Sequence, residues 1–169
     1  MPIRIRQLRR GDGRWVVRAD ALFDEASDPR AAAAYLRDPA NVCFLALDGD
    51  TPVGFLRGTA LRQLKTGRRQ MFLYEIAVAR AYHRRGIGRA LVRALLAYCR
   101  RQGHEEAFVF TDPGNAAAVG LYRSTGAITE TPADRMFVYR LAPSRRRGGS
   151  VPAAPAPQGR RAPRSRRTD

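Results

Sequence analysis

Two glycines, Gly86 and Gly88, lie in a basic stretch between an apolar run and an amphipathic segment. Because glycine has no Cβ atom, the backbone at these positions can approach a bulky anion closely. If a helix begins here, its first N–H groups have no intrahelical partner and point outward. The surrounding arginines Arg84, Arg85 and Arg89 add positive charge and planar donors that suit phosphate oxygens. The pattern predicts an anion cradle, although a solvated basic helix start has the same local composition.

Two carboxylates lie near this turn in unusual settings. Glu75 interrupts the apolar run 71–78, where a buried carboxylate needs either a role or a partner such as a nearby arginine. Asp112 follows the next apolar run at its C-terminal end, where α/β sheets place ligands. Asp112 could equally cap a helix that starts near Asn115. Both side chains are therefore candidates for chemistry, with a structural alternative beside each.

The first half of the chain contains the elements that must position these residues. Alternation of Ile3, Ile5 and Leu8 with polar residues predicts a strand over 2–8. Two helical stretches follow, through residues 16–22 and 30–37. Three apolar runs follow, over 41–47, 53–61 and 71–78. Because turn residues separate them, they predict the strands of an antiparallel meander.

The second half changes to an alternation of helix and strand. Apolar residues at helical spacing predict a helix from Gly86 to near Gly103, and the run 107–110 predicts a strand parallel to 71–78. A second helix is expected over 115–124, followed by a closing antiparallel pair, 127–129 with 135–141. The order predicts an α/β domain: a meander, a β-α-β-α unit and a C-terminal hairpin.

The charge of the chain is divided unevenly. Of the formal net charge of +16 over 169 residues, residues 143–169 hold eight arginines and one acid, which is +7 and leaves +9 for residues 1–142. The composition of 143–169, rich in Pro, Gly, Ala and Arg, predicts a disordered tail after a single domain, 1–142. Such a tail permits contact with nucleic acid or an anionic membrane. The composition favours a solubilising appendage without a specific partner.

Several classes of protein are disfavoured by what the sequence lacks. No stretch approaches the roughly 20 apolar residues of a membrane span, and residues 1–6 do not read as a signal peptide. Cys43 and Cys99 have neither metal-ligand spacing nor the pattern of a disulfide framework. His83 and His104 lack neighbouring ligand residues, so no metal is expected. A reduced, cytoplasmic location fits best.

The order of elements, with a basic glycine turn after the third meander strand, resembles the GNAT superfamily of N-acetyltransferases over residues 2–142. The resemblance implies an α/β (α+β) fold whose mixed, mostly antiparallel sheet has a splayed parallel strand pair and is flanked by helices. It also implies acetyl-CoA as cofactor, with pyrophosphate in the cradle and pantetheine on the preceding strand. The implied cofactor residues are Ile76, Ala77, Val78, His83, Arg84, Arg85, Gly86, Ile87, Gly88, Arg89, Asn115 and Tyr122. His83 stands where the family usually has Gln or Arg.

A second motif supports the same resemblance. Residues 115–126 match the family pattern N-x-x-A-x-x-L-Y-x-x-x-G. Tyr122 thereby matches the tyrosine credited with protonating the departing CoA thiolate, although a tyrosine on an amphipathic helix is usually a core residue. Within the superfamily, the segments 73–78 and 110–115 and the pair Met136-Phe137 are most similar to GNAT-type aminoglycoside 3-N-acetyltransferases.

The resemblance implies direct attack of an amine on the acetyl thioester. Because an alkylammonium has no lone pair at neutral pH, a base must first remove a proton. Glu75 is the first candidate for that base and Asp112 the second, with Tyr122 as the acid. A backbone N–H near Val78 would polarise the thioester carbonyl.

The implied acceptor is the 3-amino group of an aminoglycoside, whose acetylation would confer resistance, and a homodimer is expected. A polycationic acceptor needs carboxylates, and the available ones are Asp24, Glu25, Asp28, Glu75, Asp112 and Asp134. Two alternatives stay open. One is a GNAT enzyme for another small amine or a protein amine. The other is a basic nucleic-acid-associated protein with a vestigial acetyl-CoA fold.

Overall fold

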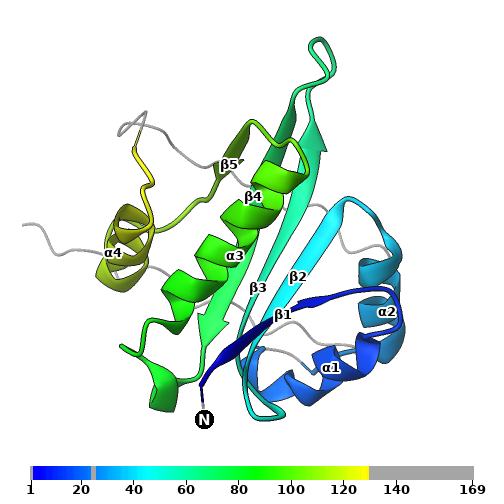
Figure 1. Cartoon of the computed structure of the whole chain (residues 1–169), viewed down its shortest axis with the longest axis vertical. Coiled ribbons are helices and arrows are strands. Elements are labelled where there is room, and N and C mark those ends of the chain that lie inside the picture. The colour runs from blue at the N-terminus through cyan, green and yellow to red at the C-terminus, as the bar shows by residue number, and fades with distance from the viewer. Residues whose placement is uncertain (1, 24–25, 130–169) are drawn as a thin grey trace, which may run out of the picture. The chain divides into compact units, whose positions relative to one another are not determined.

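A five-stranded mixed sheet in the order β1-β2-β3-β4-β5 is the centre of the computed structural model, which describes residues 2–23 and 26–129 (Figure 1). Strands β1 to β4 are antiparallel, and β5 runs parallel to β4. The predicted meander followed by a parallel strand is confirmed. The strand bounds are Arg4–Leu8, Asn41–Asp48, Thr51–Arg62, Arg69–Val78 and Glu106–Phe108.

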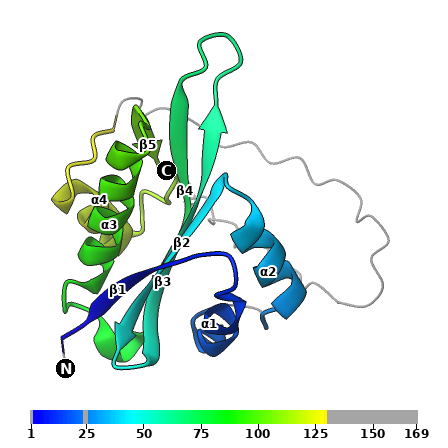
Figure 2. The ribbon, with the colours of Figure 1, turned by 45° about the vertical axis from the view of Figure 1, so that its right-hand side comes forward.

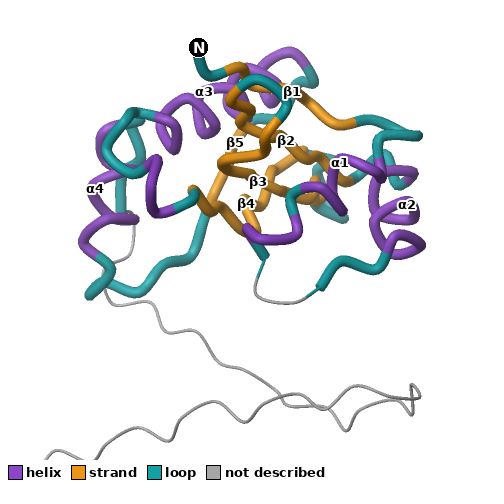
Figure 3. Tube along the Cα trace, turned by 90° about the horizontal axis from the view of Figure 1, so that it is seen from below, coloured by secondary structure: helices purple, strands orange, loops and turns teal. Residues whose placement is uncertain are grey.

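Helices cover both faces of this sheet (Figures 2 and 3). One face carries α1 (Gly13–Arg18), the short 3-10 turn η1 (Asp20–Leu22) and α2 (Pro29–Arg37). The other face carries α3 (Ile87–Arg101), against which α4 (Ala116–Ser124) packs. A second 3-10 turn, η2 (Arg80–Tyr82), links β4 to α3. The described fold is thus a helix–sheet–helix arrangement.

Strand β2 supplies apolar side chains to both faces. Its alternate residues Phe44 and Leu45 are buried on opposite sides, the first in the core beneath α3 and the second in the core beneath α1 and α2. Leu91 of α3 is buried in the first of these cores and Trp15 of α1 in the second. A strand buried on both faces reads as a continuous apolar run, as residues 42–47 do. Each such buried side chain contributes about 1.5–3 kcal/mol.

The β3–β4 ladder contains a β-bulge. Arg57 pairs with Glu75, but its neighbour Gly58 pairs with Leu73, so Tyr74 is an extra residue on β4. An extra residue shifts the alternation of side chains by one position. As a result, Leu73 lies in the core beneath α3, whereas Glu75 faces the side of α2.

Strands β4 and β5 part next to this bulge. They are paired only between Gln70–Phe72 and Glu106–Phe108, while β4 continues to Val78. The splayed parallel pair expected from the sequence is therefore present. Among the described residues, no strand pairs with the last part of β4 on the β5 side.

One predicted element differs. Residues 127–129 form no strand within the described part of the chain. A strand requires a hydrogen-bonded partner, and the expected partner, 135–141, lies outside the described residues. Several other predicted residues also lie outside the described part of the chain. They are three candidate substrate residues, the pair Met136-Phe137 and the tail: Asp24, Glu25, Asp134, 136–137 and 143–169.

Of the helices described, none has the length and apolar character needed to cross a bilayer.

Candidate active site

The N-terminus of α3 differs from those of α2 and α4. Helix α2 is capped by the Asp28 carboxylate, which accepts the Arg30 N–H at 2.8 Å, and α4 by the Asn115 side chain, which accepts the Ala118 N–H at 3.0 Å. Helix α3 begins at Gly86 with no side-chain cap. In the described part of the chain, no side chain accepts a hydrogen bond from the first N–H groups of α3, whereas α2 and α4 each have such a cap.

The turn before α3 has the backbone shape of an anion site. Gly86 has φ of 78° and Arg84 has φ of 62°, both in the left-handed region. Turns that include left-handed residues gather successive N–H groups into a concave nest. A Cβ added at Gly86 would meet no atom within 4 Å, so the space in front of this turn is open. The residues present fit a pyrophosphate group, with Arg84, Arg85 and Arg89 exposed around it.

Gly88 also allows a close contact between two helices. A Cβ at this position would lie 3.3 Å from Cδ2 of Leu121. The second glycine therefore lets α4 pack closely against the start of α3. That contact brings the helix containing Tyr122 next to the cradle.

Side-chain contacts tie the cradle turn to the sheet. Nε2 of His83 lies 2.7 Å from the Val78 carbonyl oxygen. Because a carbonyl only accepts, Nε2 carries the proton in this contact. Tyr82 donates to Asp48 at 2.9 Å, and the Arg85 guanidinium lies 4.8 Å from the Tyr82 ring centroid. His83 thus fastens the turn to the end of β4.

Within residues 2–23 and 26–129, a strand pairs with the end of β4 on one side only. Gly54 of β3 pairs with Val78, and a Cβ at Gly54 would come within 3.0 Å of the Ala77 carbonyl oxygen. On the other side β5 has already parted from β4. Residues 76–78 are therefore not paired with β5, although the Val78 carbonyl contacts His83, and the binding of a pantetheine arm to their backbone stays a prediction.

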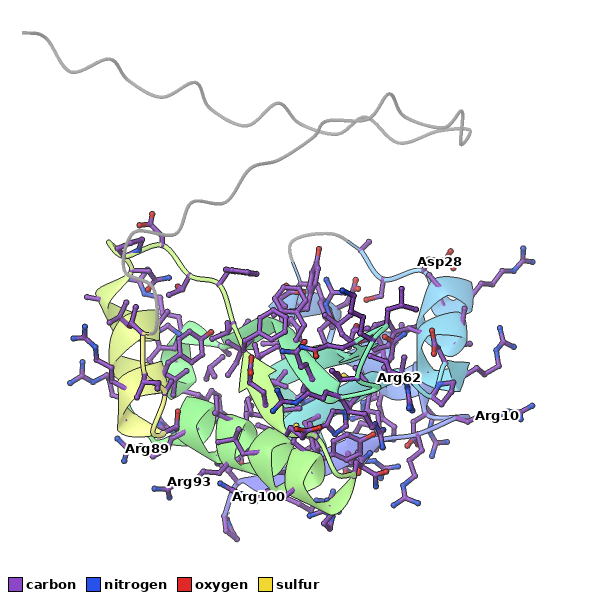
Figure 4. The ribbon with its side chains drawn as sticks, turned by 90° about the horizontal axis from the view of Figure 1, so that it is seen from above. Arg10, Asp28, Arg62, Arg89, Arg93 and Arg100 are labelled. Carbon is purple, nitrogen blue, oxygen red and sulfur yellow. The ribbon has the colours of Figure 1, made fainter. Side chains whose placement is uncertain are left out.

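A pocket of about 560 Å³ lies between α2 and the sheet, beside the bulge. Two of its lining residues are carboxylates, Glu75 from β4 and Asp28. Figure 4 shows Asp28 at the start of α2. Apolar and aromatic side chains such as Phe23 and Tyr35 complete much of the wall. The pocket can hold a small organic acceptor with one or more ammonium groups.

Glu75 forms an ion pair across the bulge. Nε of Arg57 donates to Oε2 of Glu75 at 2.7 Å, and both side chains are about one-third exposed, 33% and 32%. The Arg57 guanidinium also lies 4.1 Å from the Tyr74 ring centroid. The arginine partner that the sequence left as an alternative therefore exists. The ion pair uses Oε2, so Oε1 is the oxygen that could accept a proton from an acceptor.

Of the other titratable groups that line the pocket, Cys43 and Tyr35 do not suit a base. Burial raises the pKa of the Cys43 thiol to about 12 and that of the Tyr35 hydroxyl to about 12. Both groups are neutral near pH 7. Tyr35 instead donates to the Gly58 carbonyl at 3.0 Å, which secures α2 to the bulge.

Asp112 lies apart from this pocket. Its exposed carboxylate accepts the Gly114 N–H at 2.7 Å, and its carbonyl accepts the Asn115 N–H at 2.9 Å. Asp112 shapes the turn before α4, whereas the cap of that helix is Asn115. The pocket lining does not include Asp112.

Tyr122 packs against the core beneath α3 while part of the side chain reaches the surface. Burial raises the pKa of its hydroxyl above the ordinary value of 10.0. The hydroxyl therefore holds its proton at neutral pH, as a general acid must.

Sequence reasoning missed Arg57 and Tyr74. Arg57 is a lone arginine in the apolar stretch of β3, the same signal that singled out Glu75 on β4. Their pairing depends on the β3–β4 register, which the sequence alone does not state. Tyr74 belongs to an aromatic cluster with Phe72, Phe108 and Phe110 where the strands part.

The fold, the splayed strands and the uncapped glycine turn define a class of acetyl-CoA-dependent acyltransferase. The model of the acetyltransferase (GNAT) family matches residues 5–127, and the chain belongs to this family. Acetyltransferases of this family use acetyl-CoA as the acetyl donor.

Particular relatives differ in what their names say they act on. The N-alpha-acetyltransferase RimI of Mycobacterium tuberculosis is 38% identical over 131 residues, 74% of this chain and 78% of the relative. Rat N-acetyltransferase 8B is 31% identical over 93 residues, 55% of this chain, and the match spans only 42% of the rat protein. An aminoglycoside acetyltransferase from an uncultured soil sample, solved with sisomicin, is 26% identical with a TM-score of 0.76, over 83% of this chain and 97% of that one.

Proposed function

We propose that this protein transfers the acetyl group of acetyl-CoA to an amine of an aminoglycoside, with the 3-amino group of the deoxystreptamine ring as the site. The observation that carries the proposal is the pocket beside the bulge, with Glu75 and Asp28 in its wall. An acceptor with several ammonium groups needs more than one carboxylate within reach. Similarity to the structure solved with sisomicin supports the same acceptor class.

The donor would lie along the splayed strands. Its pyrophosphate would contact the uncapped N–H groups of α3 and Arg84, Arg85 and Arg89, and its pantetheine arm would contact the backbone of 76–78. When bound, acetyl-CoA supplies a thioester carbonyl that an amine can attack. A backbone N–H near Val78 is the donor proposed to polarise that carbonyl.

Glu75 is the proposed base. It lies three residues before Val78, about 10 Å along the strand at roughly 3.3 Å per residue, which leaves room for the acceptor amine and one bridging water. One ammonium proton would pass to Glu75 before the attack. As the C–N bond forms and the C–S bond breaks, the sulfur would take the proton of Tyr122, and the second proton that the nitrogen releases would return to Tyr122 through water. Asp28 would hold a second ammonium group of the acceptor.

A protein α-amine is the second candidate acceptor. The 38% identity to the RimI protein over 78% of its length favours it. An α-amine also needs deprotonation, so Glu75 would have the same role. The two proposals differ in what fills the rest of the pocket.

The test is a mass-spectrometric assay with acetyl-CoA and three acceptor sets: aminoglycosides, polyamines, and peptides with free N-termini. We expect a single added acetyl group on aminoglycosides that contain deoxystreptamine, located at the 3-amino position by fragmentation or NMR. Acetylation of peptides alone would replace the first proposal by the second.

A further inference from the structure

A permanent cation lies in the wall of the pocket that is proposed to receive an ammonium group. The Arg57 guanidinium lines that pocket and is one-third exposed. A bare cation there would repel the acceptor. Its position beside the proposed base therefore calls for a function that only a guanidinium provides.

Arg57 is held on two sides by consecutive residues of β4. The bulge places both Tyr74 and Glu75 next to it: its charge lies 4.1 Å from the Tyr74 ring centroid, and Nε contacts Oε2 of Glu75 at 2.7 Å. Stacking and ion pairing at once restrict the rotamers of a long side chain. The guanidinium is thus a fixed part of the pocket wall.

The remaining donors of Arg57 determine what it can recognise. A guanidinium has five N–H groups and no acceptor, and the contact with Glu75 uses Nε. Its Nη groups can therefore contact only an oxygen or another acceptor. The pocket therefore presents two groups side by side: the Glu75 carboxylate, which can accept a proton, and the Nη groups of Arg57, which can donate hydrogen bonds.

We propose that Arg57 determines acceptor specificity, selecting amines that carry an oxygen on the neighbouring carbon. Glu75 would take the proton of the amine while an Nη group of Arg57 donates to that oxygen. The inference rests on the proposed function and narrows its acceptor class. It includes aminoglycoside amines next to a hydroxyl or ether oxygen and peptide α-amines next to a carbonyl. It disfavours lysine side chains and polyamines.

The experiment compares two small acceptors, trans-2-aminocyclohexanol and cyclohexylamine, with the full-length protein and acetyl-CoA. The ratio of their kcat/KM values is measured for the wild type, R57Q and R57K. The amines differ in intrinsic basicity, but that difference is common to all three proteins. If a variant loses the orientation of Glu75, kcat/KM falls for both amines. A change in their ratio therefore reports the contact between Arg57 and the oxygen.

We expect the ratio to fall about 10- to 100-fold in R57Q, the loss typical of a hydrogen bond from a charged donor, with R57K in between. The fall should appear in KM and kcat of the amino alcohol. R62Q is the matched control, because Arg62 is an exposed arginine at the end of the same strand (Figure 4). Its ratio should equal that of the wild type.

An unchanged ratio in R57Q and R57K, with aminoglycosides still acetylated, would overturn this inference and leave the proposed function standing. A ratio that depends on Arg57 in a protein that acetylates no aminoglycoside would support the inference and contradict the aminoglycoside assignment. If R57Q does not fold, R57K alone decides, since it keeps the charge but lacks the planar fork. A wild type that acetylates no amine would overturn both.

Discussion

Two interactions involve the Glu75 carboxylate, the ion pair with Arg57 and the proposed transfer of a proton from an acceptor. Its Oε2 is paired with Arg57, and its position in the pocket wall makes Oε1 the oxygen for an acceptor. A carboxylate held at one oxygen keeps its orientation without giving up the other. The ion pair and the proposed proton transfer are therefore compatible, whereas Asp112 is engaged in its own turn, away from the pocket.

Replacing this carboxylate tests the base directly. We expect Glu75→Gln to lower kcat by roughly a hundredfold or more at neutral pH, because the amide cannot take a proton. Glu105→Gln, which alters an exposed pair with Arg68 at 2.6 Å, is the matched control and should leave kcat unchanged. If Asp112→Asn caused the large loss and Glu75→Gln only raised KM, the base would be Asp112.

Tyr35 gives a prediction for the pH dependence of stability. Its pKa is raised from 10.0 to about 12 by burial, so between these pH values the unfolded chain loses the phenolic proton and the folded chain keeps it. The free energy of unfolding should therefore fall as pH rises from 10 to 12. Tyr35→Phe should cost about 1 kcal/mol at pH 8 through the lost bond to Gly58, and less at pH 12. Urea unfolding at both pH values measures this, and a constant difference would contradict it.

At the scale of elements, the bulge in β4 organises the site. It turns Glu75 away from the core beneath α3, and the parallel strand β5 leaves β4 at the same place. Bulges commonly redirect a side chain and end a pairing. The bulge therefore lies at both the wall of the proposed acceptor pocket and the opening proposed for the donor.

Gly58 lies opposite this bulge and has no room for a side chain. An added Cβ would lie 2.9 Å from both Sδ of Met71 and the Phe72 carbonyl oxygen. The sulfur can move but the backbone oxygen cannot, so Gly58→Ala should lower stability by about 1–3 kcal/mol. Thermal unfolding measures the loss. Gly120→Ala, at a position without positive φ where an added Cβ would meet no atom within 4 Å, is the control without a clash.

At the scale of the molecule, a row of arginines in the described part of the chain lies on the face of the sheet opposite the proposed acceptor pocket. Helix α3 carries four arginines and no acid, and Arg89, Arg93 and Arg100 lie along its outward side (Figure 4). The pocket is on the opposite face of the sheet, where Glu75 and Asp28 lie. Attraction of a polycation must therefore be local, since the net charge of +16 opposes it at a distance.

Removal of residues 143–169 takes away +7 of this charge. We expect a chain ending at residue 142 to keep its melting temperature and its kcat. Its kcat/KM for a polycationic acceptor should rise by about twofold at low salt, because less positive charge repels the acceptor. Above about 0.5 M salt the difference should vanish. A loss of activity on truncation would show instead that the tail takes part in the reaction.

Much of the fold followed from local patterns. Alternating and helical apolar spacings predicted the strands and helices now described, because burial of one face imposes these periods on a sequence. The glycine and arginine turn likewise predicted an anion cradle, since backbone freedom and charge are properties of neighbouring residues.

The side on which Glu75 lies was decided by the tertiary structure. Regular alternation from Leu73 would place Glu75 in the same core, and only the extra residue at Tyr74 moves it to the pocket. The tertiary structure likewise decided the pairing of Glu75 with Arg57 and the packing of α4 against Gly88. Registers and close contacts join residues far apart in the chain, and their energies depend on the whole packed core. The sequence by itself predicted the elements and the proposed donor site, whereas the packing of those elements formed the pocket that is proposed for the acceptor.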